Sequence, residues 1–223
     1  TDADGESVDS SDSVQVSNSA PVVNSVSILP ASGVTTASSV GCSAGVSDPD
    51  AEQLSVTYAW SNGSTGASLG TGASLTLSPG VIQPGEILVC TASVTDGYGA
   101  STSDSTSVTV DNSVPVIASV TITPANPYND DSLNCAVSAS DVDGQSLAAN
   151  VSWINTSTGT GLGLGVNLTL SSATAMPGET IQCTVDVDDG MGGSASLSSS
   201  VILGNRAPDL PVLAISPIPA TSL

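Results

Sequence analysis

Apolar and polar residues alternate along several short stretches of the chain, with the two-residue period of a β-strand that is buried on one face. Two such stretches, residues 40–46 and 88–94, carry a cysteine among their apolar positions. A third stretch, residues 56–60, lies between them and ends in Trp60. The alternation predicts three strands whose cysteines and tryptophan point toward one interior.

The same pattern returns after about ninety-three residues, which identifies an internal repeat. The recurring pairs are Cys42 and Cys135, Cys90 and Cys183, and Trp60 and Trp153. The repetition runs past both complete copies, because residues 1–21 align with residues 95–115 and residues 205–208 open a further copy. A tandem array is therefore predicted, and we expect it to continue beyond the chain at both ends.

The repeat sets the expected domain boundaries. Residues 19–112 and residues 113–205 form the two complete domains, residues 1–18 are the C-terminal end of a preceding repeat, and residues 206–223 are the start of a following one.

The four cysteines occur as two pairs, each 48 residues apart within one repeat. No histidine and no Cys-x-x-Cys pair accompanies them, so two disulfides within the domains are predicted rather than a metal site. The alternative is a buried free thiol at each position. Disulfides predict an oxidising compartment, and we expect an extracellular, cell-surface or secreted protein.

The composition supports an all-β fold and excludes some classes of binding partner. Phe is absent, aromatic residues make up 2%, and one Lys or Arg stands against 21 acidic residues, for a net charge of −20. Nucleic acid is excluded as a partner, because its phosphates are bound through Lys and Arg, and anionic membrane surfaces are disfavoured for the same reason. No apolar run is long enough to span a bilayer in this segment, and the implied partner is cationic.

The sequence lacks several of the residue types that enzymes use for catalysis. The chain has no His and no Lys, and the cysteines are assigned to disulfides, so a nucleophile with an activating base cannot be assembled. Carboxylates remain, but they recur in both repeats rather than forming one pair across a cleft. We expect that the protein is not an enzyme.

A disulfide between two inward strands, with Trp60 or Trp153 packed on it as a core residue, resembles an immunoglobulin-like (Ig-like) β-sandwich. The Asn-x-x-Pro joints, such as residues 18–21 and 112–115, and the Asp-rich loops resemble the tandem bacterial Ig-like, PKD-like and cadherin-like repeats of large extracellular surface proteins. The resemblance implies tandem sandwiches, each with one disulfide between its sheets, in a structural or adhesive protein.

The acidic residues gather in particular loops. Asp48 and Asp50 follow the strand of Cys42, and Asp96 follows the strand of Cys90, so both loops are expected at the end of the sandwich where the chain enters through Asn18.

Calcium accepts about six to eight oxygen ligands in loose geometry, and we hypothesise a calcium ion at each joint between domains. The candidate ligands are Asn18, Asp48, Asp50 and Asp96 around the first repeat, and Asp111, Asn112, Asp141, Asp143, Asp188 and Asp189 around the second. The alternative is that these residues only serve turn geometry. Glu86 and Glu179 are expected at the opposite end as solvated turn residues, with contact to a neighbouring domain's joint as the alternative.

Two functions remain. The first is a structural component of an extracellular filament, stalk or surface fibre that associates with itself or with neighbouring copies of the repeat. The second is an adhesive module that recognises a cell-surface or glycan ligand through residues 63–72 and 156–165, where the two copies differ most.

Overall fold

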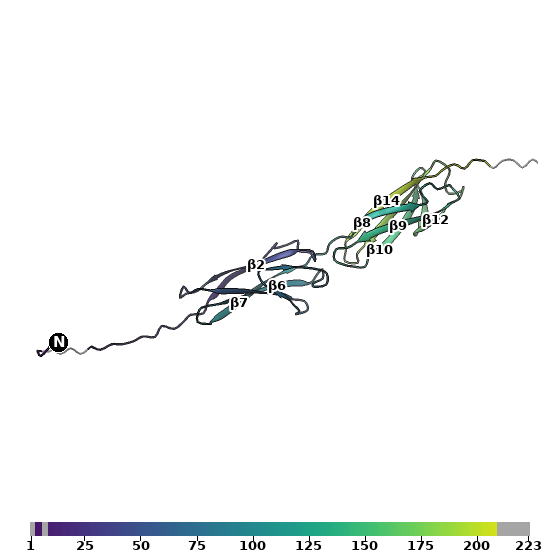
Figure 1. Ribbon diagram of the computed structural model, residues 1–223. Coiled ribbons are helices and arrows are strands. Elements are labelled where there is room, and N and C mark those ends of the chain that lie inside the picture. Colours follow the sequence, from purple (N-terminus) through teal and green to yellow (C-terminus); the bar gives the residue numbers. More distant parts are fainter. Residues whose placement is uncertain (1–2, 6–8, 209–223) are drawn as a thin grey trace, which may run out of the picture. The chain divides into compact units, whose positions relative to one another are not determined.

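The computed structural model describes residues 3–5 and 9–208, and these contain fourteen strands and no helix. The chain divides into two compact units, Thr1–Ser113 with Val142–Gly144, and Val114–Asp141 with Gln145–Leu223. Figure 1 shows each unit as two facing layers of strands. The predicted all-β fold is confirmed. No helix in the described ranges is long and apolar enough to cross a membrane.

The first unit is a sandwich of a three-stranded and a four-stranded sheet. The smaller sheet has the order β1-β2-β5, formed by β1 (Val22–Leu29), β2 (Ser39–Ser47) and β5 (Ser74–Thr76). The larger has the order β4-β3-β6-β7, formed by β4 (Ser68–Thr71), β3 (Ser55–Asn62), β6 (Ile87–Thr95) and β7 (Ser101–Thr109). Every strand pairing is antiparallel.

The second unit repeats this topology strand for strand. Its three-stranded sheet has the order β12-β9-β8, formed by β12 (Asn167–Thr169), β9 (Ser132–Ser140) and β8 (Val116–Thr123). Its four-stranded sheet has the order β11-β10-β13-β14, formed by β11 (Thr160–Leu164), β10 (Ala148–Asn155), β13 (Thr180–Asp188) and β14 (Ser194–Ile202). The repeat in the sequence is therefore a repeat in strand order and pairing.

One disulfide joins the two sheets of each sandwich, as predicted. Cys42 on β2 is bonded to Cys90 on β6, and Cys135 on β9 is bonded to Cys183 on β13. The alternative of free thiols is excluded, since all four cysteines are paired. Successive side chains of a strand point to opposite faces, so buried and outward residues alternate along β6 and β13. The cysteines therefore share the buried face with the neighbouring apolar residues.

Each tryptophan lies beside its disulfide in the core. Trp60 on β3 is directly opposite Cys90 in the strand register and is 1% exposed, and Trp153 lies opposite Cys183 in the second sandwich. The indole Nε1 of Trp60 donates to the carbonyl of Gly72 at 2.9 Å, so the buried polar edge of the ring is satisfied. The tryptophan and the disulfide thus form the centre of each core.

Candidate functional site

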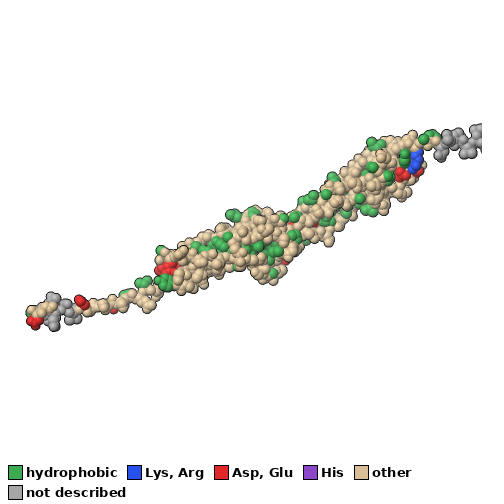
Figure 2. Space-filling model, viewed as in Figure 1, with side chains coloured by type: hydrophobic (Ala, Val, Ile, Leu, Met, Phe, Trp, Pro, Cys, Tyr) green, Lys and Arg blue, Asp and Glu red, His purple; other side chains and the backbone are tan. Residues whose placement is uncertain are grey.

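Acidic loops gather at one end of the first sandwich, which we call the acidic end. It consists of residues 48–54 after β2 and the turn of residues 96–100 between β6 and β7. The chain enters the sandwich here: Asn18 Nδ2 donates to Asp96 Oδ2 at 2.9 Å, and the backbone N–H of Ser19 donates to Asp50 Oδ2 at 2.6 Å. Figure 2 shows acidic side chains on this end of the unit, beside the N-terminal segment.

Three carboxylates converge at the acidic end. One oxygen each from Asp48, Glu52 and Asp96 can be chosen so that all three lie within 4.8 Å of one another. We call these residues the three-carboxylate cluster. Asp48 Oδ2 and Glu52 Oε2 are buried and have no hydrogen-bond partner. Unpartnered buried anionic oxygens are costly, so this arrangement favours a positive ligand.

The electrostatics of the cluster reflect this crowding. Desolvation by burial, followed by the charges of Asp96 and Asp48, raises the pKa of Glu52 against the opposing effect of a hydrogen bond from the backbone of Gly97. The side-chain hydrogen bond from Asn18 lowers the pKa of Asp96, and hydrogen bonds from the backbone of its turn act in the same direction. Asp96 is therefore held as an anion beside a carboxyl group whose ionisation is disfavoured, which is the situation that a cation relieves.

Part of the acidic loop serves turn geometry. Asp48 Oδ1 accepts the backbone N–H of Asp50 at 2.7 Å, and Asp96 Oδ1 accepts those of Tyr98 and Ala100, each at 2.9 Å. These are bonds of the Asx-turn type. A role in turn geometry does not use both oxygens of these residues in the same way: Asp48 Oδ2 has no hydrogen-bond partner, whereas Asp96 Oδ2 accepts from Asn18. Asp50 is exposed and holds the N-terminal segment instead.

Glu52 was not among the candidates from the sequence. It lies four residues after Asp48, in a stretch whose spacing carries no motif, and it meets Asp96 only because the loop after β2 approaches the β6–β7 turn. The second repeat has Gln145 at the corresponding position. Within the described part of the chain, the cluster is the one place where three acidic, cysteine or histidine side chains come together in this way.

The candidates of the second repeat are placed as turn and joint residues. Asp143 is buried, and its Oδ2 accepts the N–H of Ser113 at 2.6 Å, as Asp50 does from Ser19. Asp189 Oδ1 accepts two backbone N–H groups of its turn, at 2.7 and 2.9 Å. Asp188 is exposed and caps Gly190.

The remaining candidates lie in the linker and in the preceding loop. The N–H of Asp111 donates to the carbonyl of Val34 at 2.6 Å, and its side chain is exposed. Asn112 and Asp141 are partly buried, and neither joins a cluster of three carboxylates. The structure therefore brings Asp48 and Asp96 together with Glu52, and gives the second repeat no equivalent cluster in its described residues.

No protein-family model and no curated protein matches the sequence. Among solved structures, the three N-terminal domains of the highly immunogenic outer capsid protein (Hoc) of bacteriophage RB49 match with a TM-score of 0.32 and 14% identity, over 84% of this chain and 71% of that one. The mouse nectin-like molecule 4 ectodomain matches with a TM-score of 0.34 and 13% identity, over 87% and 67%. Cadherin domains 1–5 of protocadherin gamma B2 match with a TM-score of 0.33 and 17% identity, over 85% of this chain and 41% of that one.

The fold assignment rests on the sheet orders and disulfides described above, which are those of Ig-like sandwiches.

Proposed function

We propose that the chain is a segment of an extracellular filament, stalk or surface fibre built from Ig-like repeats, and that calcium rigidifies the joint at the acidic end of the first sandwich. Two sandwiches of one topology, each closed by a disulfide, suit a passive role outside the cell. The observation that carries the calcium assignment is the three-carboxylate cluster with its two buried, unpartnered oxygens. The proposal gives the chain no catalytic role.

The ligand chemistry fits calcium. All of the available groups are oxygens, and Asp48, Glu52 and Asp96 would supply the negative charge that a hard divalent cation requires. Asn18 reaches the cluster through Asp96, so an ion bound there would connect the N-terminal segment to both acidic loops. Such a connection would restrict bending of the chain where it enters the sandwich.

The two joints are not equivalent in this proposal. Gln145 replaces the carboxylate of Glu52 with a neutral amide, so the second repeat offers one fewer charged ligand. Because calcium affinity depends on the number of charged ligands, we expect the first joint to bind the ion more tightly. In the second repeat, Asp143 Oδ2 accepts the N–H of Ser113 directly.

The N-terminal segment supports the continuation of the array. Residues 3–5 form the same turn as residues 97–99, and Gly5 and Gly99 have φ values of 82° and 90°. Val14 and Val16 are 89% and 86% exposed, although they align with Val108, which packs against the core, and with Val110, which is 1% exposed. We assign residues 1–18 to the C-terminal end of a preceding repeat, in which Val14 and Val16 would be buried. Residues 209–223, assigned to a following repeat, lie outside the described residues.

Calcium-dependent stiffening can be tested on the intact chain. Thermal unfolding and small-angle scattering are measured in millimolar calcium, in millimolar magnesium and in chelator. We expect calcium to raise the melting temperature and to narrow the distribution of molecular dimensions, with a smaller effect of magnesium, which demands stricter geometry. Identical melting curves and dimensions in calcium and chelator would remove the ion from the account.

An adhesive function is the second candidate. Four residues of segment 156–165, one of the two segments that this function would use for ligand specificity, line a hollow in the second sandwich: Thr158, Thr160, Gly161 and Leu162. In this case the sandwiches would position that loop for a partner on another molecule. Binding of the chain to a cell surface or glycan array, lost when residues 156–165 are exchanged for residues 63–72, would favour this function.

A further inference from the structure

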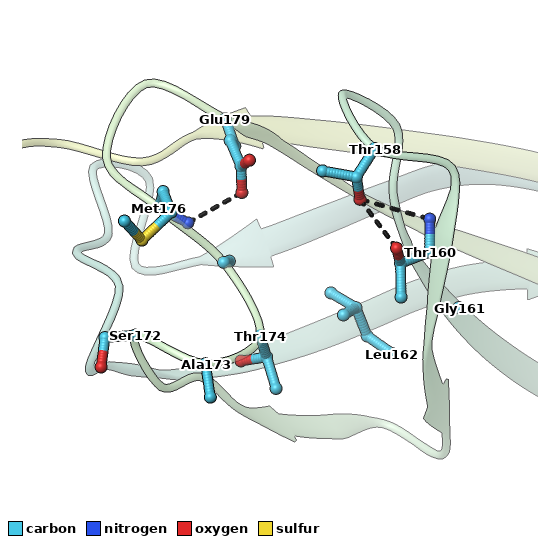
Figure 3. Close-up of a pocket in the computed structure, with 10 residues that line it drawn as sticks. Thr158, Thr160, Gly161, Leu162, Ser172, Ala173, Thr174, Met176 and Glu179 are labelled. Atoms are coloured by element: carbon cyan, nitrogen blue, oxygen red, sulfur yellow. Dashed lines mark hydrogen bonds between the residues drawn. The ribbon is translucent and has the colours of Figure 1, made fainter.

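A hollow of about 370 Å³ opens at the end of the second sandwich opposite its acidic loops. It lies between the β10–β11 hairpin and the loop that connects β12 to β13 (Figure 3). Figure 3 shows Thr160 and Leu162 across the hollow from Met176 and Glu179. The walls combine threonine hydroxyls, a few apolar side chains and one carboxylate.

At one position on this wall, the first sandwich has a larger side chain packed in its core. Ala175, on the wall of the hollow, stands where the first repeat has Ile82, which is packed in its core. Shortening a buried side chain leaves space that the surroundings fill only in part. The divergence between the repeats therefore produces a hollow at this place, whereas the disulfide and the tryptophan are retained.

A fixed carboxylate lies at the hollow. Glu179 Oε2 accepts hydrogen bonds from the N–H of Met176 and from Asn155 Nδ2, each at 2.7 Å. These two bonds, that from Met176 first, lower the pKa of Glu179. The carboxylate is thus both oriented and anionic at neutral pH.

No cation of this chain is available to neutralise it. The chain contains a single Lys or Arg, Arg206. Its guanidinium is already bonded to Asp130 at 2.9 Å and to Asp131 at 3.1 Å. A positive group at Glu179 would therefore come from outside the chain, and the net charge of −20 would attract a cationic partner over a distance.

The other residues that line the hollow indicate which kind of ligand would fit it. Leu162, Ala175 and Met176 provide apolar contact, while Thr158 and Thr160 provide hydroxyl oxygens. None of the described residues that line the hollow is aromatic, and sugars are usually bound on aromatic rings. A lysine side chain matches this combination, because its stem is apolar and its ammonium group donates three hydrogen bonds.

We infer that this hollow is a binding site for an ammonium group on an apolar stem, as presented by a lysine side chain of a partner protein. The stem would lie against Leu162 and Met176, and the ammonium group would bond to Glu179 and to the threonine hydroxyls. The inference does not depend on calcium or on the array, since the site lies within one sandwich.

The test is a titration of the isotope-labelled full chain, followed by backbone NMR shifts. The probe is Nα-acetyl-lysine methylamide, and its matched control is the norleucine analogue, which lacks the ammonium group. We expect saturable shifts at Leu162, Ala175 and Met176 with the lysine probe, and binding at least tenfold weaker with the norleucine probe. Equal binding of both probes, preferential binding of methyl glucoside, or no saturable shift in this region would overturn the inference.

Two variants locate the site. Ala175→Ile restores the side chain of the first repeat and should abolish lysine binding while the spectrum stays that of the folded chain. Glu179→Gln removes the charge and should weaken binding at least tenfold. Wild-type affinity in a folded Ala175→Ile or Glu179→Gln chain would contradict the assignment. The calcium titration of these variants should be unchanged, which separates this inference from the proposed function.

Discussion

Asn155 and Glu179 are joined by a 2.7 Å hydrogen bond from side-chain amide to carboxylate, and Asn62 and Glu86 form the same bond at 2.8 Å in the first sandwich. Asn155 is fully buried, and its Oδ1 also accepts the N–H of Ser157 at 3.1 Å. The asparagine therefore ties the hairpin after β10 to the turn before β13. The two glutamates, expected chiefly as solvated turn residues, accept hydrogen bonds from buried amides.

Removal of Asn155 should destabilise the second sandwich. Asn155→Ala leaves the N–H of Ser157 without its acceptor and removes one of the two hydrogen bonds to Glu179 Oε2, that from Met176 being kept. The loss of such buried hydrogen bonds typically costs about 2 kcal/mol. Urea unfolding measures the change. Asn150→Ala, at an exposed position on the same strand, is the control and should alter stability by less than about 0.5 kcal/mol. Equal effects of the two variants would show that the network contributes no stability.

The Glu179 network should make stability depend on pH in one direction. Because the pKa of Glu179 is lowered in the folded state, its contribution is present above its unfolded pKa and is lost as the pH falls through the folded pKa. The difference in unfolding free energy between wild type and Glu179→Gln should be largest above about pH 5 and should vanish in stronger acid. Urea unfolding across this pH range measures it. A difference that is constant or grows toward acid would contradict the prediction.

Loss of one disulfide should destabilise its sandwich strongly. The bond between Cys42 and Cys90 closes a loop across 48 residues of sequence separation, for which chain entropy predicts about 4 kcal/mol. The double variant Cys42→Ala/Cys90→Ala should therefore melt well below wild type in calorimetry. Reduction of wild type, which also breaks the bond between Cys135 and Cys183, should lower the melting temperatures of both sandwiches. Unchanged melting in both experiments would mean that the cores alone hold the sandwiches.

Arg206 should order the chain where it leaves the second sandwich. Its guanidinium bonds to Asp130 and Asp131 and lies 4.1 Å from the centre of the Tyr128 ring. Exposed ion pairs contribute little to global stability, so Arg206→Ala should speed amide hydrogen exchange at Gly204 with little change in melting temperature. Arg206→Lys keeps the charge but loses the two-pronged geometry and should give an intermediate rate. Exchange that is the same in all three chains would refute this role.

The sequence allowed the fold to be predicted largely because its signals are local and duplicated. The alternation of apolar and polar residues around Cys42 and Cys90 indicates which side chains point inward. The same alternation in the second repeat shows that the pattern is not accidental. Glu52 could not be found in this way, because its proximity to Asp96 arises only when two loops meet in space. The role of Asn155 was hidden for a related reason: a polar residue before a glycine-containing turn resembles a solvated one until its burial is known.

The hollow in the second sandwich was also beyond sequence analysis. The loop of residues 156–165 was predicted to carry specificity because the copies diverge there, but the opposite wall comes from residues 172–176. The difference between Ile82 and Ala175 looks conservative in sequence, since both are apolar. Its consequence depends on which neighbours could occupy the vacated volume.

Calorimetric titration of calcium into the chelator-treated full chain tests the central claim most directly, with Glu52→Gln and Gln145→Glu as paired variants. The account predicts one tight site in wild type, at least tenfold weaker binding when Glu52 becomes the amide found in the second repeat, and an additional site when Gln145 becomes the carboxylate found in the first. Identical heats for wild type and Glu52→Gln, or no calcium binding by wild type, would contradict it.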